Sequence, residues 1–481
     1  MGKSIKINFA FNLLNTIVGL LFPLITFPYI SRVLFADGIG KVQFFQSIIN
    51  YISLFAALGI PLYAVKEIAK NKNNIEKRNK TAVEILILYT LLTIAAYLIV
   101  MLITCFVDSI RNNWSLFVLL SLHLILVAIG AEWFYQGVED FKYITIRSLV
   151  LKLLTLVALF AFVKEKSDLM IYALLLVMAE AGNNIFNFIH LRKYINFNRD
   201  SFKKLNVGRH VRPALKIFIL NLVVSIYVNL DSIMLGFIVG TTAVGYYTAA
   251  TRITRTICGF STALGTVMLP RLSSYYNSGQ VEKFYEISSR GLSFIVSITI
   301  PMVLGLMITA PLLMPIFCGD SFRPSIPTLQ IISPLILFIG ISGLLGTKIL
   351  YAQDKENIVI YCTCLGAIIN FVLNIILIPK YAQNGAAFSS VIAEFLVTTS
   401  MLYLGRKYLT YNFFNKDTFQ SLLFSVIAFM PVYAIHVMHL SIYVELAVDI
   451  LCTLLIYIIC MYTFNKYYRN IINNIINKLL R

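Results

Sequence analysis

Long apolar runs separated by short polar segments dominate this chain. The runs at 82–106, 116–131 and 442–462 carry few charges. As helices, such runs are long enough to cross about 30 Å of hydrocarbon. A membrane barrel would instead alternate apolar and polar residues over strands of about ten residues. The pattern therefore predicts an all-α polytopic membrane protein.

The apolar runs predict about fourteen transmembrane helices. The expected spans are 7–30, 42–65, 81–106, 114–136, 143–163, 169–190, 214–239, 245–269, 291–317, 328–352, 358–378, 385–404, 419–438 and 443–464. The first run is long and lacks a small-residue cleavage site, so we interpret it as an uncleaved span. Four parts follow: a six-helix set at 1–190, a basic linker at 191–213, a second six-helix set at 214–405, and a helix pair with a tail at 406–481.

Composition and charge agree with this interpretation. Of the 481 residues, 59% are hydrophobic and 13% are charged, which is about half the charged share of soluble proteins. The formal net charge is +18, and its densest segment is 191–213. Basic loops stay on the cytoplasmic side of a membrane, so both termini are predicted to be cytoplasmic. Loop charge of this kind needs no nucleic-acid partner, and loops this short leave no room for a catalytic domain.

The two six-helix sets carry weakly related sequence. The turn after the first span reads ADGIGKV at 36–42, and the turn after the seventh reads TAVGYY at 242–247. These and similar matches are about 205–209 residues apart. Repeats of six spans have the same orientation and are related by an axis along the membrane normal. A substrate route would then lie between the repeats.

Charged side chains inside spans indicate function, because burying them in a membrane is costly. Arg252 and Arg255 are three residues apart and share one helix face. Asp231 lies at comparable depth on the preceding span. One alternative is an Asp231–Arg252 ion pair that fixes helix packing. The other is a hydrated cavity that receives an anion, since the planar fork of arginine suits phosphate.

The first half carries a comparable pair, Lys152 and Glu180, and Glu394 lies deep in the twelfth predicted span. Together with Asp231, these residues are candidates for ion coupling or for interhelical pairing. No P-loop motif is present, so transport would not be driven by ATP hydrolysis in this chain. Coupling to protons, to sodium ions or to the membrane potential alone is compatible with these residues. No motif predicts a metal or another cofactor.

Several segments, taken together and in order, resemble the Wzx-type polysaccharide flippases of the multidrug/oligosaccharidyl-lipid/polysaccharide exporter superfamily. They include PYISRVLFADGIGKVQFFQS at 28–47, EWFYQGVEDFKYITIRS at 132–148, NLDSIMLGF at 229–237, VGYYTAATRI at 244–253 and NIILIPKYAQNGAAFSSVIAE at 374–394. The segment at 132–148 is the most specific of these. The resemblance covers residues 5–405. Many family members have twelve spans, so the helix pair at 406–481 departs from the pattern.

The resemblance implies two six-helix bundles that face each other in a V. It also implies alternating-access translocation of an undecaprenyl-pyrophosphate-linked oligosaccharide to the outer leaflet of the bacterial inner membrane, for O-antigen or capsule assembly. Membrane lipids, and the polysaccharide polymerase with its chain-length machinery, would be its partners. By resemblance, Arg32 and Lys41 join Arg252 and Arg255 as candidate contacts of the pyrophosphate and sugar.

Two other classes of protein remain as alternatives. A cation-coupled multidrug antiporter of the same superfamily would favour hydrophobic cations and an acidic cavity, against which the buried arginines argue. A polymerase or glycosyltransferase of the membrane would need convergent carboxylates or a large outer loop. Neither feature is visible in the sequence.

Overall fold

The computed structural model describes residues 5–195, 205–409, 416–438, 440–465, 468–470 and 473. Every regular element in these residues is helical, and ten helices among them are long and apolar enough to cross a membrane. The predicted all-α polytopic membrane fold is therefore confirmed. Contacts within the chain divide it into two compact units, Met1–Gly245 and Tyr246–Arg481.

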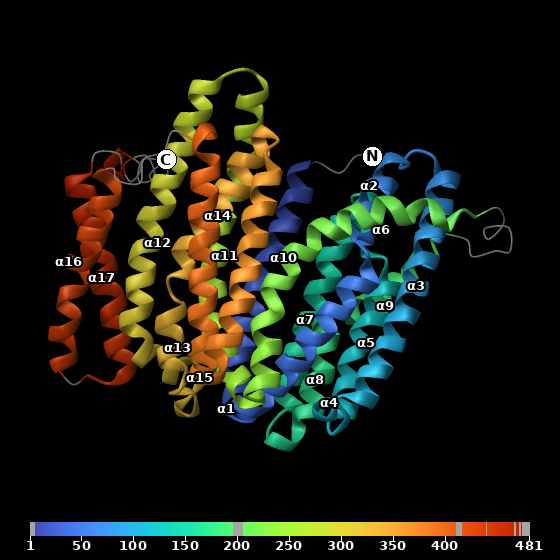
Figure 1. The fold of residues 1–481 in the computed structure, drawn as a ribbon, viewed down its shortest axis with the longest axis horizontal. Helices are drawn as coiled ribbons and strands as arrows, with labels where there is room; N and C mark the ends of the chain where they lie inside the picture. The colour runs from blue at the N-terminus through green and yellow to red at the C-terminus, as the bar shows by residue number, and fades with distance from the viewer. Residues whose placement is uncertain are drawn as a thin grey trace. The chain divides into compact units, whose positions relative to one another are not determined.

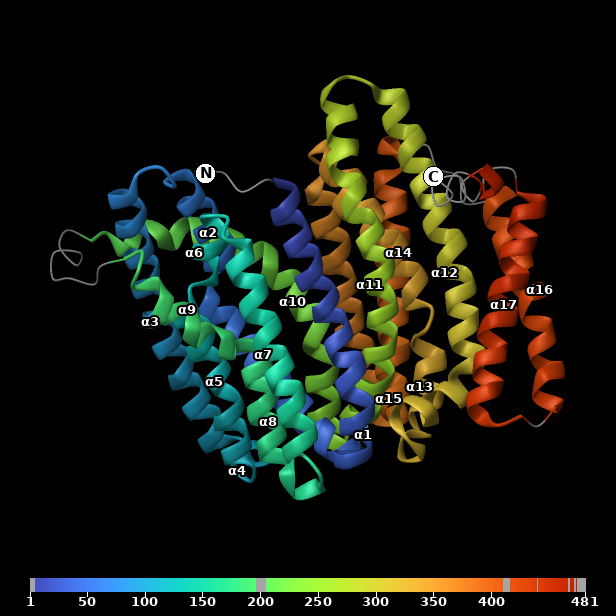
Figure 2. The ribbon, with the colours of Figure 1, turned by 180° about the vertical axis from the view of Figure 1, so that it is seen from behind.

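The first unit runs from blue to green in Figures 1 and 2. Its helices are α1 (Ile5–Ala57), α2 (Ile60–Lys70), α3 (Ile75–Phe106), α4 (Asp108–Arg111), α5 (Trp114–Gly130), α6 (Glu132–Gly137), α7 (Phe141–Phe162), α8 (Leu169–Val177), α9 (Asn183–Leu191) and α10 (Val211–Ile238), followed by the start of α11 (Thr241–Asn277). A π-helical turn, Met178–Gly182, joins α8 to α9. Its largest described core packs α2, α3 and α6 together around Ile68, Phe134 and Tyr135.

Single residues in the left-handed backbone region bend the helices of this unit. Helix α1 covers the first predicted span and most of the second, and it is broken at Phe35, where φ is 56°. The second predicted span, 42–65, ends in α2. The turn expected at 36–42 is therefore helical, because one left-handed residue redirects the chain and helical hydrogen bonding resumes at once. Ala131, with a φ of 43°, separates α5 from α6 in the same way.

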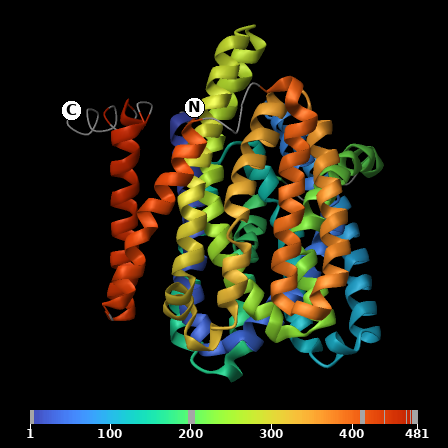
Figure 3. The ribbon, with the colours of Figure 1, turned by 60° about the vertical axis from the view of Figure 1, so that its left-hand side comes forward.

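The second unit continues from α11 to the C-terminal helices in red (Figure 3). Its remaining helices are α12 (Val281–Cys318), α13 (Ser325–Ile332), α14 (Leu335–Leu344), α15 (Glu356–Gly405), α16 (Lys416–Val437) and α17 (Ile442–Phe464). Helix α15 covers two predicted spans and bends at Ala382, where φ is 48°. The α16–α17 pair packs on α12: the Ser421 hydroxyl donates to Ser297 Oγ at 2.7 Å, and the Tyr457 hydroxyl donates to the Ser297 carbonyl at 2.5 Å.

Residues 36–40 and 241–245, at the two turns that the sequence relates as repeats, contact each other in the first unit. A Cβ atom on Gly40 would lie 1.7 Å from the Thr241 carbonyl oxygen, and one on Gly245 would lie 1.9 Å from the Ala36 carbonyl oxygen. Thr241 also donates a hydrogen bond to Asp37 at 2.8 Å. The absence of a side chain at both glycines is therefore what lets the two backbones come this close.

Helix α10 belongs to the first unit, whereas the sequence assigns 214–239 to the second six-helix set. It packs on α1 and α2, and a Cβ atom on Gly59 would lie 2.6 Å from the Ala214 carbonyl oxygen. The contacts thus divide the chain at Gly245, later than the basic linker at 191–213. Residues 196–204 of that linker lie outside the described residues. The division into two six-helix sets stays a prediction.

Candidate functional site

A polar cluster, which we call the Arg147 cluster, lies within the first unit. Its centre is the Arg147–Glu132 ion pair of α7 and α6. Lys152 follows on α7, and helix α9, which packs on α7, carries the buried Asn183 and Asn187. The left-handed Ala131 starts α6 at Glu132, and Glu132 accepts a charge-assisted contact from Arg147 Nη2 at 3.4 Å. The charge of Glu132 also acts on Lys152, which follows Arg147 on α7. The three charged members carry one net positive charge.

Arg147 is buried but only partly paired. It is 8% exposed, and its guanidinium lies 5.3 Å from the centre of the Tyr143 ring. Among the described residues, no hydrogen-bond acceptor reaches its Nε or Nη1 atoms. Buried polar atoms are nearly always paired with protein, water or ligand. The two unpaired donors of Arg147 are therefore available to a water molecule or to a ligand.

Helix α9 adds buried amide groups next to α7. Asn187 is fully buried, donates to Asn184 Oδ1 at 3.1 Å, and keeps its own Oδ1 without a partner among the described residues. Asn183 Oδ1 likewise has no hydrogen-bond partner among the described residues. Unpaired amide oxygens accept hydrogen bonds from hydroxyl groups, and arginine donors bind anions. The cluster therefore offers both donors and acceptors that lack protein partners among the described residues.

The predicted first-unit contacts, Arg32 and Lys41, both lie on α1 near its bend. Arg32 is exposed, and its Nη1 donates to the Pro28 carbonyl at 2.5 Å. Lys41 forms an ion pair with Asp37 at 2.8 Å. Their side chains have local partners, and their role in substrate binding stays a prediction.

The coupling candidates of the first unit have partners other than those expected. Lys152 and Glu180 are both described, and no ion pair joins them. Glu180 instead accepts from Gln46 Nε2 at 2.8 Å and lies 3.9 Å from His123. The partners of Glu180 lie on α1 and α5, whereas the charge that acts on Lys152 is that of Glu132 on α6. Asp231 is 4% exposed on α10, where its charge acts on Tyr51 of α1.

The second unit brings together two of its predicted charges. Arg255 on α11 and Glu394 on α15 both act electrostatically on Cys258. Glu394 is buried and accepts a hydrogen bond from Ser342 of α14 at 2.6 Å. Arg252 lies one turn before Arg255 and is half-buried. The expected Asp231–Arg252 pair joins residues of different units and stays a prediction.

A second buried cluster anchors the end of the basic linker to α3. Glu84 is fully buried and accepts from Arg209 Nη2 at 2.5 Å, from the Asn206 backbone N–H at 2.8 Å and from His210 Nε2 at 2.9 Å. The other ring nitrogen of His210 hydrogen-bonds the Tyr63 hydroxyl at 2.7 Å. Burial lowers the pKa of His210, against the opposing charge of Glu84. These contacts hold residues 206–210 on the helices of the first unit.

The sequence analysis did not identify Arg147 or Glu84 as site residues. Arg147 is the last residue but one of the segment that carries the most specific resemblance, 132–148, but its distance from Glu132 depends on the turn between α6 and α7. Glu84 lies at the start of an apolar run, and its partner His210 is 126 positions away. In the sequence, the signal that could have pointed to either residue is a charged side chain close to the end of a predicted span.

Two family models match large parts of the chain. One is described as "Polysaccharide biosynthesis protein" and matches residues 5–276. The other is described as "Lipid II flippase MurJ" and matches residues 183–457.

Individual proteins named for polysaccharide export or biosynthesis are also similar to this chain in sequence. The chain is 27% identical over 397 residues to a protein of Escherichia coli named "Putative O-antigen transporter", covering 80% of this chain and 93% of the relative. A Staphylococcus aureus protein named "Capsular polysaccharide biosynthesis protein CapF" is 23% identical over 57% of this chain and 69% of its own length.

Solved structures resemble the fold. A lipid II flippase MurJ in an inward closed conformation has a TM-score of 0.75 at 16% identity, covering 97% of this chain and 100% of that chain. An inward-facing multidrug resistance transporter of the MATE family has a TM-score of 0.62 at 16% identity, covering 85% of this chain and 95% of that chain.

Proposed function

Because the chain belongs to the polysaccharide biosynthesis protein family of Wzx-type flippases, we propose that it flips undecaprenyl-pyrophosphate-linked oligosaccharide repeat units. The direction is from the cytoplasmic to the outer leaflet of the bacterial inner membrane, for assembly of a surface polysaccharide. Relatives named for O-antigen transport and for lipid II flipping support a lipid-linked oligosaccharide as substrate. The protein acts as a transporter and forms no bond in its substrate.

The Arg147 cluster is the observation that carries this proposal. Buried cationic donors are costly within a membrane unless they receive a negative group. Arg147 offers two unpaired donors, and the nearby asparagines offer acceptors for sugar hydroxyls. A pyrophosphate-linked sugar presents both kinds of group, whereas a hydrophobic cation presents neither.

Transport proceeds by alternating access of two six-helix bundles that face each other, at 1–190 and 214–405, with the pair at 406–481 alongside. The bends at Phe35 and Ala382 support fourteen crossings, since α1 and α15 are each long enough for two. Arg32, Lys41, Arg252 and Arg255 contact the pyrophosphate and sugar on this route.

Asp231 and Glu394, both buried carboxylates, are the candidates for coupling, with protons, sodium ions or the membrane potential as the driving force. The polysaccharide polymerase and its chain-length machinery receive the product and are the proposed protein partners.

A flipping assay with the full chain in liposomes tests the role of Arg147. The readout is movement of a lipid-linked oligosaccharide between leaflets. Hydrogen bonds to charged groups contribute about 1.5–3 kcal/mol, so Arg147→Gln should slow flipping by at least about tenfold. Arg111→Gln is the matched control, because Arg111 lies on α4 with its side chain 61% exposed.

Deletion of the gene should cause unpolymerised lipid-linked units to accumulate, and their structure would identify the sugar. Normal flipping by Arg147→Gln would exclude Arg147 as a substrate contact. Absence of flipping by the native protein, together with no accumulation in the deletion strain, would overturn the proposed function itself.

A cation-coupled multidrug antiporter is the second candidate, and its support is the fold shared with the MATE transporter. Overexpression would then confer resistance to cationic dyes, and Asp231→Asn would abolish that resistance. Dye resistance without any flipping of lipid-linked sugar would favour this candidate over the first.

A further inference from the structure

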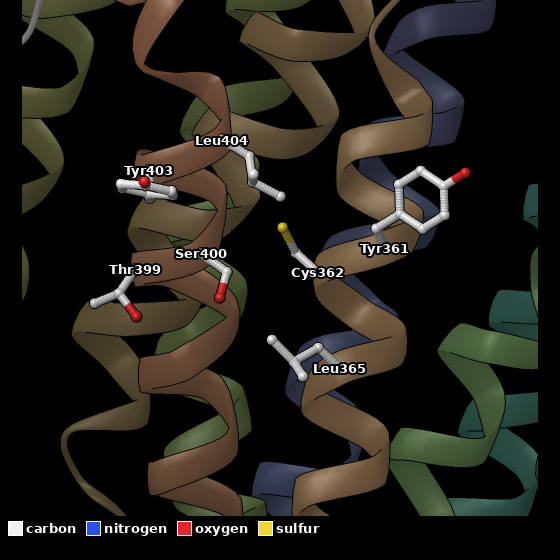
Figure 4. A pocket seen from close by; sticks show the side chains of 7 residues that line it. All are labelled: Tyr361, Cys362, Leu365, Thr399, Ser400, Tyr403 and Leu404. Carbon is white, nitrogen blue, oxygen red and sulfur yellow. The ribbon is translucent and has the colours of Figure 1, made fainter.

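A groove of about 460 Å³ lies between the two halves of α15, at the end away from the bend at Ala382. Figure 4 shows Cys362 and Leu365 of the first half facing Ser400 and Leu404 of the second half across this space. The groove is open to the surface, has a largely apolar lining and is bounded by little more than one turn of each half of α15.

Two tyrosines flank the groove on the outer sides of these helices (Figure 4). Tyr361 is 69% exposed and Tyr403 is 64% exposed. Tyrosine is enriched where membrane hydrocarbon meets the polar headgroups, because its ring is apolar and its hydroxyl is polar. Their position indicates that this end of the groove lies at a membrane interface.

The surface of α15 around the groove is apolar and exposed. The most apolar window of α15 is only 22% buried inside the protein, and large side chains such as Ile368, Phe371 and Ile375 are exposed along it. In a membrane-spanning chain such a face meets acyl chains. A groove of this width in it is filled by hydrocarbon, because an empty space would forfeit dispersion contacts on both sides.

Basic residues mark the same end of the groove. Arg406 follows α15 directly, is exposed, and places its guanidinium 4.8 Å from the centre of the Tyr403 ring. Lys407 is also exposed, and Lys355 precedes α15. Asp354 and Glu356 lie at this end too, so these five side chains carry one net positive charge. Arginine stacked on a groove residue is suited to a phosphodiester, because its fork donates two hydrogen bonds.

We propose that this groove binds one acyl chain of an anionic glycerophospholipid, with the headgroup phosphate held by Arg406. The chain lies between Cys362 and Ser400 in the hydrocarbon layer. The phosphate lies at the level of the two tyrosines, in the leaflet that meets the end of α15. This lipid is a bound component of the protein and is distinct from the transported substrate.

Lipid retention by the purified full chain tests the proposal. Native mass spectrometry would count phosphatidylglycerol or phosphatidylcholine, with identical acyl chains, that stays bound after detergent exchange. The native protein should retain phosphatidylglycerol in preference. One interfacial arginine is worth about fivefold in affinity for anionic lipid, so Arg406→Gln should reduce this preference by about that factor. Ser400→Trp fills the groove and should lower retention of both lipids.

Lys380→Gln is the matched control, because Lys380 is exposed on the same helix near its bend. It should retain both lipids as the native protein does. Equal retention of the two lipids by the native protein would overturn the proposal, and so would unchanged retention in both Arg406→Gln and Ser400→Trp. Displacement of phosphatidylglycerol by an undecaprenyl phosphate would also overturn it, because the groove would then hold the polyprenyl chain. Each variant is compared only when it elutes as the native protein does in size exclusion.

Discussion

At the scale of single residues, the missing side chain of Gly40 has a direct energetic consequence. An added Cβ atom would lie 1.7 Å from the Thr241 carbonyl oxygen, and backbone cannot move aside as a flexible side chain can. Overpacking of this kind costs about 1–3 kcal/mol or more. Gly40→Ala should therefore lower the thermal midpoint and the yield of monodisperse protein, measured by fluorescence-detected size exclusion after heating.

Gly208→Ala is the control for that measurement. Its nearest neighbour would be Asn206 Oδ1 at 3.9 Å, so the added methyl group meets no close atom. A Gly40→Ala protein as heat-resistant as the Gly208→Ala protein would contradict the close approach of the segments at 36–42 and 242–247.

At the scale of elements, the attachment of residues 206–210 to α3 depends on pH. Burial lowers the pKa of His210, so the unfolded chain binds this proton more readily than the folded chain. The stability contributed by the neutral ring is complete above the unfolded pKa of about 6.5 and is lost as pH falls below it. One proton changes stability by at most about 1.4 kcal/mol per pH unit.

Thermal midpoints between about pH 7.5 and about pH 5.5 test this dependence. The thermal midpoint of the native protein should decrease as pH is lowered across this range. The thermal midpoint of His210→Gln should decrease less steeply. Identical slopes for the native protein and His210→Gln would remove His210 as the cause.

The docking of the C-terminal helix pair on α12 gives a second prediction at this scale. Tyr457→Phe removes the hydroxyl that donates to the Ser297 carbonyl at 2.5 Å. A buried hydrogen bond contributes about 1 kcal/mol, so the thermal midpoint should fall by a few degrees. Tyr443→Phe on the same helix, where Tyr443 is 68% exposed, should leave the midpoint unchanged. Equal thermal midpoints for the two variants would show that the Tyr457–Ser297 hydrogen bond does not stabilise the protein.

Individual elements also show how far sequence reasoning reaches. The apolar runs predicted helices of the right type and the resemblance identified the family, because both signals are local. The bends at Phe35 and Ala382 fall in the predicted breaks at 31–41 and 379–384, where polar residues interrupt the apolar runs. The sequence does not show that each helix resumes after a single left-handed residue, since neither position is a glycine. The Arg147–Glu132 contact arises from the turn between α6 and α7, and the Glu84–His210 contact joins residues 126 positions apart. Tertiary structure alone brings these groups together.

At the scale of the whole molecule, the charge pattern predicts that both termini lie in the cytoplasm. Fusions of a periplasm-active phosphatase to either end should be inactive, and fusions of a fluorescent protein that folds only in the cytoplasm should be bright. A phosphatase fusion in the loop before α5, near Asn112, should be active. An active phosphatase at the C-terminus would indicate an odd number of crossings and would exclude fourteen.

The contact between Gly40 and Thr241 has a mirror in the contact between Ala36 and Gly245. Residues 40 and 245 are separated by 205 positions, and so are residues 36 and 241, so each backbone approach is the counterpart of the other under the repeat. This reciprocity is the signature of an isologous interface, in which two identical partners meet across a twofold axis. The close approach inside one chain thus has the form of a contact between two identical partners, in which the same glycine position is used twice.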